Sequence, residues 1–385
     1  MPDLSLPHEY AVMPAGDLAL RARRLKAQMG SSLCILGHHY QADEVVEHAD
    51  YVGDSLRLSQ VAAGQSEARF IVFCGVHFMA ESADILTRPD QVVCLPNVLA
   101  GCAMADMADD AGVESAMEEL SALAGPARIV PVTYVNSTAA TKAVTARFGG
   151  ACCTSSNVAN VFSWALAPAG KGGGAADKIL AVPDQHLGRN TAVALGYSLD
   201  DCVVYDPHLP SGGLDGEQVR RARFILWKGQ CYVHQIFRPS DIPAIRRQMP
   251  GVRVIVHPEC PYDVVALADE SGSTEQIIRA ISDSPAGTVW AVGTEANLVN
   301  RLARRLGGAG PGGQPDSGAP ARTIRVLADR PAHCVQMARI TLGHLVWVLD
   351  SLAAGNIINR VSVPPETARH ARVALERMIA IPRSI

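Results

Sequence analysis

The sequence lacks several features that would place a protein in a class at once. It has no run of about 18 or more uncharged apolar residues, so a membrane-spanning helix is not expected. No Lys/Arg run stands out and the formal net charge is −4, which makes nucleic acid and anionic membranes poor candidates for partners. The opening residues, MPDLSLPHEY, have no basic segment followed by an apolar one, so no signal peptide is expected.

Motifs of common hydrolases and zinc sites are missing as well. The chain contains no GxSxG and no HExxH, which disfavours a serine or zinc-dependent hydrolase. Its ten cysteines include no CxxC pair, the local spacing typical of structural zinc. Ten cysteines in a long chain without a signal peptide indicate a reducing, cytoplasmic environment. In such an environment cysteines serve as core residues, metal ligands or redox groups rather than disulfides.

What is present favours an α/β fold. Hydrophobic residues make up 48% of the 385 residues, enough for a buried core, and the length suggests two or three domains. Apolar runs of strand length alternate with helical patterns, which is typical of parallel α/β layers. The expected helices include 44–52, 55–63, 157–166, 274–282 and 296–306. The expected strands are LCILG (33–37), FIVFCG (70–75), VVCLP (92–96), IVPVTYV (129–135), ILAVP (179–183), CVVYD (202–206), VRVIVHP (252–258), VWAVG (289–293) and IRVLAD (324–329).

The same four steps occur in the same order three times, which indicates an internal repeat. A strand with a polar end comes first: ILGHHYQ (35–41), PVTYVNS (131–137) and VIVHPEC (254–260). A Ser/Gly turn before a helix comes second: GDSL (53–56), CTSSN (153–157) and SGSTE (271–275). A strand with a polar loop comes third: IVFCGVH (71–77), ILAVPDQH (179–186) and VWAVGTE (289–295). A strand, a loop and a cysteine come fourth: Cys102, Cys231 and Cys334.

The repeat predicts three similar αβα domains, over 18–104, 105–232 and 233–334. Two Gly/Pro-rich segments, 169–177 and 307–320, account for the differences in spacing and read as insertions. Amphipathic helices within 335–385 are expected to pack back on the first domain. In open parallel sheets, ligand groups gather beyond the carboxyl ends of the strands. Three units around a pseudo-threefold axis would therefore bring their polar strand ends and cysteines to an active site at the central junction.

The three repeated cysteines suggest a soft metal or an iron–sulfur cluster. A cubane held by three cysteines leaves one iron open, and that iron can act as a Lewis acid in the loss of water. For any single cysteine, a small buried hydrophobe is the simpler interpretation, and only the repeated position distinguishes Cys102, Cys231 and Cys334. The Ser/Gly turns either only cap helices or, acting together, bind carboxylates or phosphate. Glu259 is a candidate general base if it is desolvated.

Long stretches of the chain strongly resemble the quinolinate synthase family, in order from about residue 30 to the end. They are GHHYQADEVVEHADYVGDSLRLSQVAA, IVFCGVHFMAESADILTRPDQVVCLPNVLAGCAMADM, VTYVNSTAATKA, CTSSN, GQCYVHQIF, VHPECPYDVV, GSTEQII, AVGTEANLVNRL and MARITLGHLVWVL. The resemblance implies three αβα domains about a pseudo-threefold axis, in agreement with the repeat.

The resemblance also implies the activity. Such a condensing synthase, transferase in type, joins iminoaspartate (iminosuccinate) and dihydroxyacetone phosphate into quinolinate for de novo NAD biosynthesis, and releases phosphate and two waters. An aspartate-oxidising enzyme is the implied functional partner. The family holds a 4Fe–4S cluster with one cysteine per domain, which here implies Cys102, Cys231 and Cys334. Its open iron would coordinate the substrate or an intermediate.

The resemblance further implies the site residues. Proton transfers would fall to Tyr40, Tyr134 and Glu259. The implied substrate contacts are His38 and Ser55 from the first domain, Tyr134, Val135, Asn136 and Ser155 from the second, and His257, Pro258, Glu259 and Thr274 from the third.

Three departures from the family pattern bear on these expectations. FGGA (148–151) lengthens the spacing after the YVN triplet, so Ser156 competes with Ser155. His186 stands where many relatives carry Asn, which leaves its role and that of Arg189 open. No CxxCxxC surrounds Cys334, so the third ligand is unambiguous. The alternative function is a non-catalytic protein that binds dicarboxylates, which would not explain three aligned thiols.

Overall fold

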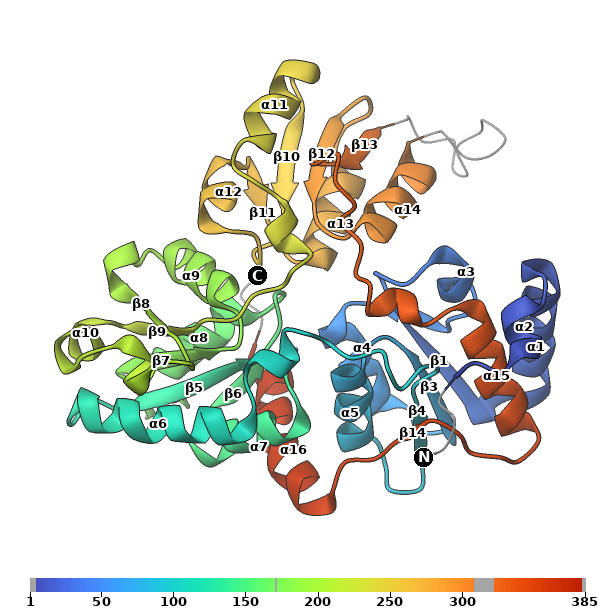
Figure 1. Cartoon of the computed structure of the whole chain (residues 1–385), viewed down its shortest axis with the longest axis horizontal. Helices are drawn as coiled ribbons and strands as arrows, with labels where there is room; N and C mark the ends of the chain where they lie inside the picture. Colours follow the sequence, from blue (N-terminus) through green and yellow to red (C-terminus); the bar gives the residue numbers. More distant parts are fainter. Residues whose placement is uncertain (1–4, 170–171, 308–321, 383–385) are drawn as a thin grey trace. The chain divides into compact units, whose positions relative to one another are not determined.

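A computed structural model describes residues 5–169, 172–307 and 322–382. The chain forms two compact units, and each is described here by itself. The first comprises Met1–Cys102 and His333–Pro365, and the second comprises Ala103–Ala332 and Glu366–Ile385. Figure 1 shows that each sheet in these units is flanked by helices.

The first unit contains one five-stranded sheet with the order β14-β4-β3-β1-β2. Its first four strands in the chain run parallel, and β14 is antiparallel to β4 at one edge. All six residues of β1 are buried, as expected for a central strand covered on both faces. The strands are β1 (Leu33–His38), β2 (Tyr51–Gly53), β3 (Phe70–Cys74), β4 (Val92–Cys94) and β14 (Arg360–Val361).

Helices of the first unit come from both ends of the chain. Helix α15 begins at a capping box between Thr341 and His344, and its buried leucines and valines recur at helical spacing. It packs against α2, whose buried face includes Leu18 and Leu25. The helices are α1 (His8–Val12), α2 (Ala15–Met29), η1 (Gly30–Ser32), α3 (Asp43–Val46), α4 (Ser55–Gly64), α5 (His77–Leu86), η7 (Met337–Arg339) and α15 (Leu342–Ala353).

The second unit contains a five-stranded parallel sheet with the order β6-β5-β7-β9-β8. Its strands are β5 (Ile129–Tyr134), β6 (Ala151–Cys153), β7 (Lys178–Val182), β8 (Cys202–Tyr205) and β9 (Phe224–Trp227). The accompanying helices are η2 (Ala105–Met107), α6 (Asp110–Ala124), α7 (Ala139–Arg147), α8 (Val158–Leu166), α9 (Gln185–Ala194), η4 (Leu199–Asp201), η5 (Pro210–Gly213), α10 (Gly216–Arg221) and η6 (His234–Ile236).

Alternate residues of β9 show that helices cover both faces of this sheet. Ile225 and Trp227 pack in the core formed with α6, α7 and α10. Phe224 faces the other way, and its ring stacks on Phe162 of α8 at 5.4 Å between centroids. A Cβ on Gly188 of α9 would come within 2.8 Å of the Leu226 side chain, so α9 packs closely on that same second face. This is an αβα sandwich.

The second unit also contains a four-stranded parallel sheet with the order β11-β10-β12-β13. Its strands are β10 (Arg253–Val256), β11 (Glu270–Ser271), β12 (Val289–Gly293) and β13 (Thr323–Val326). The helices here are α11 (Asp241–Gln248), α12 (Tyr262–Leu267), α13 (Thr274–Asp283) and α14 (Ala296–Leu306). The strongly amphipathic α13 and α14 bury Ile277, Ile281, Leu298 and Leu302.

All three sheets share one strand order, which confirms the repeat seen in the sequence. Numbered within each repeat, the order is second, first, third, fourth: β2-β1-β3-β4, β6-β5-β7-β9 and β11-β10-β12-β13. The predicted α/β class with parallel αβα units is therefore confirmed, and all nine expected strands are present. The short strands β2, β6, β11 and β14 and the buried strand β9 were not among those expected.

Two expectations about helices need correction. The pattern over 44–52 suggests one helix, but α3 ends at Val46. Tyr51 already belongs to strand β2, where it pairs with Leu36 of β1. Helix α16 (Pro365–Ala380) has nearly all its length in the second unit, whereas the sequence analysis places all of 335–385 on the first domain. There, Arg377 Nη1 donates to Gly150 O at 2.6 Å and Asn157 Nδ2 donates to Met378 O at 3.1 Å.

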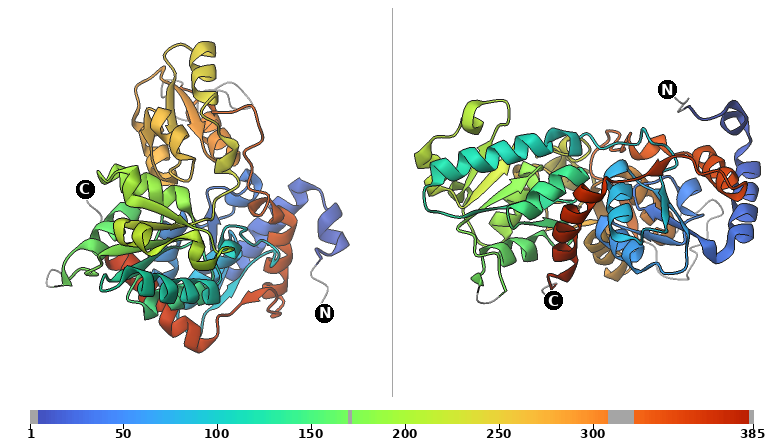
Figure 2. Two further views of the ribbon diagram at one scale, coloured as in Figure 1. Left: turned by 60° about the vertical axis from the view of Figure 1, so that its left-hand side comes forward. Right: turned by 90° about the horizontal axis from the view of Figure 1, so that it is seen from below.

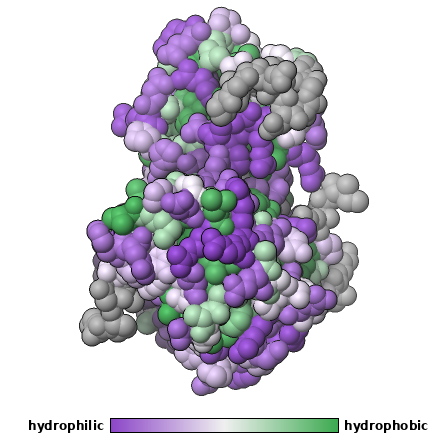
Figure 3. Space-filling model, turned by 90° about the vertical axis from the view of Figure 1, so that its right-hand side faces the viewer, coloured by the Kyte–Doolittle hydropathy of each residue, from purple (hydrophilic) through white to green (hydrophobic). Residues whose placement is uncertain are grey.

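The surface matches the absence of long apolar segments. Among the described residues, no helix combines the length and the apolar character that crossing a membrane would require. Large exposed apolar side chains such as Val12, Leu99 and Leu209 are far apart in the sequence. Figure 3 shows hydrophilic side chains over most of one face, with apolar groups in small separate areas. Two further views of the ribbon are given in Figure 2.

Candidate active site

Polar residues end the first strand of each repeat, as the sequence predicts. His38 is the last residue of β1, Tyr134 is the last of β5, and His257 follows β10 directly. The first and third turns repeat a further detail: Tyr40 N donates to His38 Nδ1 at 3.1 Å, and Glu259 N donates to His257 Nδ1 at 3.3 Å. Both imidazoles are thereby fixed in orientation at the carboxyl ends of their strands, where ligands bind in such sheets.

The three repeated cysteines share one local structure. Each lies in a loop, and a three-residue 3-10 helix begins three residues later: η2 after Cys102, η6 after Cys231 and η7 after Cys334. All three are partly exposed, whereas Cys34, Cys74, Cys94, Cys152, Cys153 and Cys260 are buried. Cys202 is also partly exposed, but it starts strand β8. The described residues include all ten cysteines, and none forms a disulfide.

Within the first unit, the loops that carry candidate residues are joined by hydrogen bonds. Gln41, which follows the HHY triplet, donates from Nε2 to Met337 Sδ at 3.5 Å, next to the Cys334 turn. Asn97, in the loop leading to Cys102, donates from Nδ2 to Arg339 O at 2.9 Å. The 35–41 loop and the Cys102 loop therefore both contact the segment that follows Cys334.

In the second unit, four buried side chains gather where β5 and β10 end. The Tyr134 hydroxyl donates a hydrogen bond to the Glu259 carboxylate. His234 Nδ1 lies 2.6 Å from Glu259 Oε2, and His257 Nδ1 lies 3.7 Å from the same atom. The two imidazole rings stack with centroids 4.5 Å apart. Exposure is 0% for His234, 2% for His257, 3% for Glu259 and 7% for Tyr134, so this cluster is shielded from water.

The electrostatics of this cluster differ from those of an isolated buried carboxyl. Burial acts to raise the pKa of Glu259, but His257, His234 and the Tyr134 hydrogen bond outweigh it and lower the pKa to about 2. Burial lowers the pKa of His257 to about 3, despite the nearby carboxylate. At neutral pH, Glu259 is therefore a carboxylate and His257 a neutral imidazole. Desolvation alone, the basis of the sequence argument for a general base, gives the opposite direction for Glu259.

Two residues that the sequence analysis did not name hold this region together. Asp184, 2% exposed, caps α9 through His186 N at 2.7 Å and Leu187 N at 2.8 Å, and its carboxylate also accepts from the Cys231 backbone N–H. Burial and the charge of Glu259 raise the pKa of Asp184 well above its usual range. Asn190 Nδ2 donates to Pro258 O and Cys260 O, both at 2.8 Å, and so fixes the backbone on either side of Glu259.

The remaining predicted contacts of the second sheet differ in their surroundings. Val135 is buried; its N–H donates to Cys153 O and its carbonyl accepts from Ser137 N, so both backbone groups are already engaged. Asn136 Oδ1 is buried without a partner among the described residues, as expected of an atom that awaits a ligand. Ser155 and Ser156 both lie in the turn before α8 and are partly exposed.

The Ser/Gly turns of the first and third repeats are alike. Ser55 and Thr274 are the first residues of α4 and α13, and the residue before each one caps the helix: Asp54 through Arg57 N and Ser273 through Gln276 N. The capping interpretation is thus correct for these turns, with the cap one residue before each candidate. Ser55 and Thr274 are at helix N-termini, a position suited to an anion.

His234 is the functional candidate that sequence reasoning missed, although a signal was present. It follows Cys231 at C-x2-H spacing, and His and Cys at short spacing are common metal ligands. The ligand atoms of Cys231, His234 and Glu259 all lie within 4.8 Å of one another. This donor set could hold a metal ion, and it lies wholly in the second unit.

His186 and Arg189 also lie close to this cluster. His186 contacts Gln230, next to Cys231, and burial, helped by the positive charge of Arg189, lowers the pKa of His186 to about 4. Glu295, in contrast, caps α14 through Asn297 N at 2.7 Å and is 0% exposed. The N-terminal part of α9, with its cap Asp184, is therefore part of the surroundings of Cys231 and Glu259.

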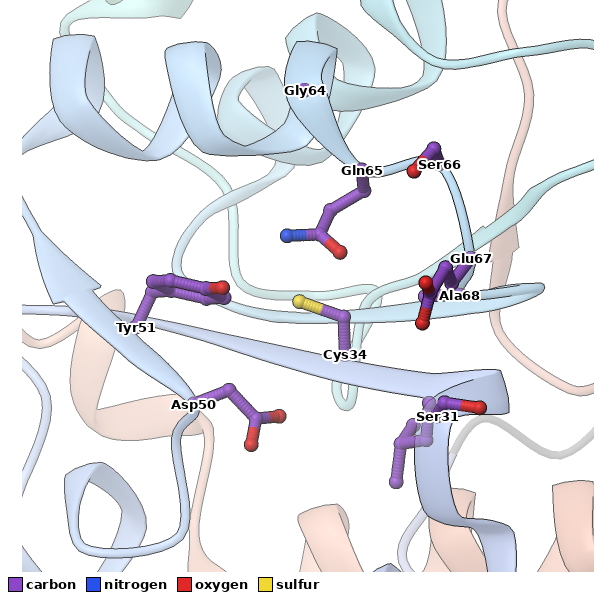
Figure 4. Close-up of a pocket in the computed structure, with 10 residues that line it drawn as sticks. Ser31, Cys34, Asp50, Tyr51, Gly64, Gln65, Ser66, Glu67 and Ala68 are labelled. Atoms are coloured by element: carbon purple, nitrogen blue, oxygen red, sulfur yellow. The ribbon is translucent and has the colours of Figure 1, made fainter.

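The first unit has a hollow of about 570 Å³, and none of the candidate site residues lines it. Cys34, near the start of β1, and Ala68, just before β3, line it, so it lies at the amino ends of parallel strands. Figure 4 shows the Cys34 thiol pointing to the side where Tyr51 lies, with the Gln65 side chain above it. Burial raises the pKa of Cys34 to about 12, so it is a protonated thiol. His38 lies at the opposite, carboxyl end of β1.

The comparisons with known proteins agree on one family. The family model described as "NadA: Quinolinate synthetase A protein" matches residues 21–380. The chain is 50% identical over 367 residues to a quinolinate synthase of Streptomyces coelicolor, covering 95% of this chain and 89% of that protein. It is 51% identical over 373 residues to one of a Nocardioides species, covering 96% and 91%. A third, from Geobacillus kaustophilus, is 49% identical over 377 residues, covering 98% and 96%.

Proposed function

The chain belongs to the quinolinate synthase family, whose members are enzymes of NAD biosynthesis, and we propose that it condenses iminoaspartate with dihydroxyacetone phosphate. The atoms balance: iminoaspartate supplies four carbons and the nitrogen, dihydroxyacetone phosphate supplies three carbons, and phosphate and two waters leave as the pyridine ring closes. Because iminoaspartate hydrolyses readily in water, we expect an aspartate-oxidising enzyme to supply it nearby in the cytoplasm.

The observation that carries this proposal is the buried Tyr134–Glu259–His257–His234 cluster beside Cys231. It joins the strand ends of two sheets in the second unit. Asn136 Oδ1, buried without a partner among the described residues, is ready to accept a hydrogen bond from a substrate. The other proposed substrate contacts are His38, Ser55, Tyr134, Val135, Ser155 or Ser156, His257, Pro258, Glu259 and Thr274. The helix N-termini among them are suited to carboxylates and phosphate.

The proton chemistry follows from the Tyr134–Glu259 pair. A phenol that donates to an ionised carboxylate can take a proton from the substrate while its own proton passes to Glu259. Because the pKa of Glu259 is lowered to about 2, its carboxylate stays ionised at neutral pH and holds the Tyr134 hydroxyl in orientation. Tyr40, whose ring meets His38 edge-on at 4.7 Å, is the proposed proton carrier in the first unit.

Cys102, Cys231 and Cys334 are the proposed ligands of a 4Fe–4S cluster. The donor set fits: three partly exposed thiols share the same position before a 3-10 helix, unlike the six buried cysteines. When bound, the cluster supplies Lewis acidity through an iron that has no cysteine ligand. In this proposal, the repeats over 18–104, 105–232 and 233–334 are three domains around a pseudo-threefold axis, with the site at their junction.

Anaerobic turnover of iminoaspartate plus dihydroxyacetone phosphate to quinolinate tests the proposal. The enzyme as purified without oxygen should be brown and contain iron and sulfide. Replacing Cys102, Cys231 or Cys334 by Ala should abolish both the cluster and the activity. The matched control is Cys202→Ala, another partly exposed cysteine, which should retain both. An iron-free enzyme with full activity would overturn the proposal that the reaction needs a cluster. Ligand binding without turnover would indicate a dicarboxylate-binding protein instead.

A further inference from the structure

We propose that the cluster-free protein binds one divalent transition-metal ion, of the Zn²⁺ class, through Cys231 Sγ, His234 Nδ1 and Glu259 Oε2. The three ligand atoms lie within 4.8 Å of one another and all belong to the second unit. This site differs from a three-cysteine cluster site because it uses one cysteine and needs neither Cys102 nor Cys334. Three protein ligands of the Cys, His and carboxylate types, with a fourth position left for water, are a usual zinc set.

The surroundings of His234 favour a ligand role for Nδ1. Its other ring nitrogen, Nε2, lies 3.1 Å from Thr294 Oγ1, a partner that can hold the proton on Nε2. Metal-ligating histidines commonly donate their second nitrogen in this way, which leaves the first nitrogen free to bind the ion. His234 is 0% exposed and Thr294 is 0% exposed, so water does not compete for this contact.

The contact between His234 and Glu259 is also compatible with a cation in place of a proton. Nδ1 and Oε2 are only 2.6 Å apart, and both side chains are buried. With the proton on Nε2, two acceptor atoms would face each other at this distance. A positive ion between them, either a proton or a metal, removes that repulsion.

The geometry needs only a small adjustment for a metal. Zinc bonds of about 2.0–2.3 Å in a tetrahedron place the ligand atoms roughly 3.3–3.8 Å from one another. Nδ1 and Oε2 must therefore separate by somewhat less than about 1 Å, and Cys231, which is partly exposed in a loop, can approach. Asp184 accepts from the Cys231 N–H and so fixes the backbone from which the thiolate extends.

The experiment is a titration of the full-length, cluster-free protein with Zn²⁺ against a chromophoric chelator, under anaerobic conditions. We expect one equivalent to bind. Cys231→Ser and His234→Asn should each weaken binding by at least about tenfold, and Thr294→Val, which removes the partner of Nε2, by about 10–100-fold. Co²⁺ in place of Zn²⁺ should give a thiolate-to-metal absorption band that disappears in Cys231→Ser.

Three control variants make the result specific. Cys102→Ser and Cys334→Ser, in the first unit, should bind Zn²⁺ as tightly as the unchanged protein, and so should Cys202→Ser, a partly exposed cysteine in β8. Circular dichroism confirms that each variant is folded, and because His234 is fully buried, Cys231→Ser is the decisive variant. Absence of a bound equivalent, or equal loss in the Cys102, Cys231 and Cys334 variants, overturns the inference.

A second arm rests on the proposed function. A Zn²⁺ ion at this site occupies the Cys231 thiolate that the cluster would need. Zinc added before cluster reconstitution should therefore lower the iron and sulfide incorporated. If zinc binds through Cys231 and His234 but reconstitution is unchanged, the assignment of Cys231 to the cluster fails while the zinc site stands.

Discussion

Replacing Asn190 by Ala should loosen the loop that carries Glu259. Asn190 is 6% exposed on α9, and its Nδ2 donates to the carbonyls of Pro258 and Cys260, each at 2.8 Å. These two carbonyls lie on either side of Glu259 in the chain. Alanine keeps the helix, because its helix propensity is higher than that of Asn, but it removes both hydrogen bonds.

The magnitude follows from the two carbonyls. A hydrogen bond contributes about 1 kcal/mol net, and a buried acceptor left without a partner costs about 1–3 kcal/mol. Because Cys260 is fully buried and Pro258 is partly exposed, most of the penalty falls on the Cys260 carbonyl. We expect the free energy of unfolding of the second unit to fall by about 2–4 kcal/mol.

Urea unfolding followed by tryptophan fluorescence measures this change, since Trp290 is fully buried in β12 of the same unit. With a slope of about 2 kcal/mol per molar urea, the midpoint should fall by roughly 1–2 M. Asn356→Ala is the matched control: Asn356 is exposed, so its replacement should change stability by less than about 0.5 kcal/mol. If both variants unfold at the same urea concentration, the Asn190 hydrogen bonds do not hold the loop.

Three further predictions concern the same unit. Tyr134→Phe removes the hydroxyl that donates to Glu259 and should lower kcat for quinolinate formation by about 10²–10⁴-fold, measured anaerobically; unchanged kcat would exclude a proton role. Acid should destabilise the fold, because the pKa of His257 is lowered to about 3 and the unfolded chain therefore binds the proton at a higher pH than the folded chain. The stability that is present above about pH 6.5 is lost as the pH falls toward 3, and the urea midpoint should fall with it. Glu259 acts in the same direction, because its pKa, lowered to about 2, is below that of an unfolded glutamate. Gly150→Ala would place a Cβ 2.0 Å from Pro131 O and should cost about 1–3 kcal/mol or more in the same urea assay; equal stability would show that the backbone there yields freely.

Much of the fold could be predicted because its signals are local. Strands such as 129–134 are apolar on both faces, and the Ser/Gly turns precede α4, α8 and α13. The weaker elements carry no such signal: β11 has two residues, and β2 lies in a segment whose apolar spacing also fits a helix. For α16, the pattern shows that Ala371, Ala374 and Leu375 form a buried face, but a pattern does not name the partner of that face. Contacts to Gly150 and Asn157 decide it.

In the candidate site, too, the features with a local sequence signal could be predicted and those that depend on distant contacts could not. The repeat correctly placed His38, Tyr134 and His257 at strand ends and gave Cys102, Cys231 and Cys334 one local setting. It did not give the ionisation of Glu259, because two imidazoles and a phenol reach that carboxylate from distant parts of the sequence. Nor did it give Asp184, which looks like an ordinary helix cap until its contact with Cys231 is seen, or Asn190, which looks like an ordinary residue within a helix until its contacts with the loop around Glu259 are seen. The ligand assignments for the substrates remain predictions.

The division of the chain has a consequence for protein synthesis on the ribosome. The first unit combines Met1–Cys102 with His333–Pro365, and the long segment between them belongs to the second unit. While the nascent chain emerges, β4 has no β14 beside it and α2 has no α15 to cover its apolar face until more than three hundred residues have been translated. The second unit, apart from α16, emerges in one stretch, so the half that is translated first should be the last to mature.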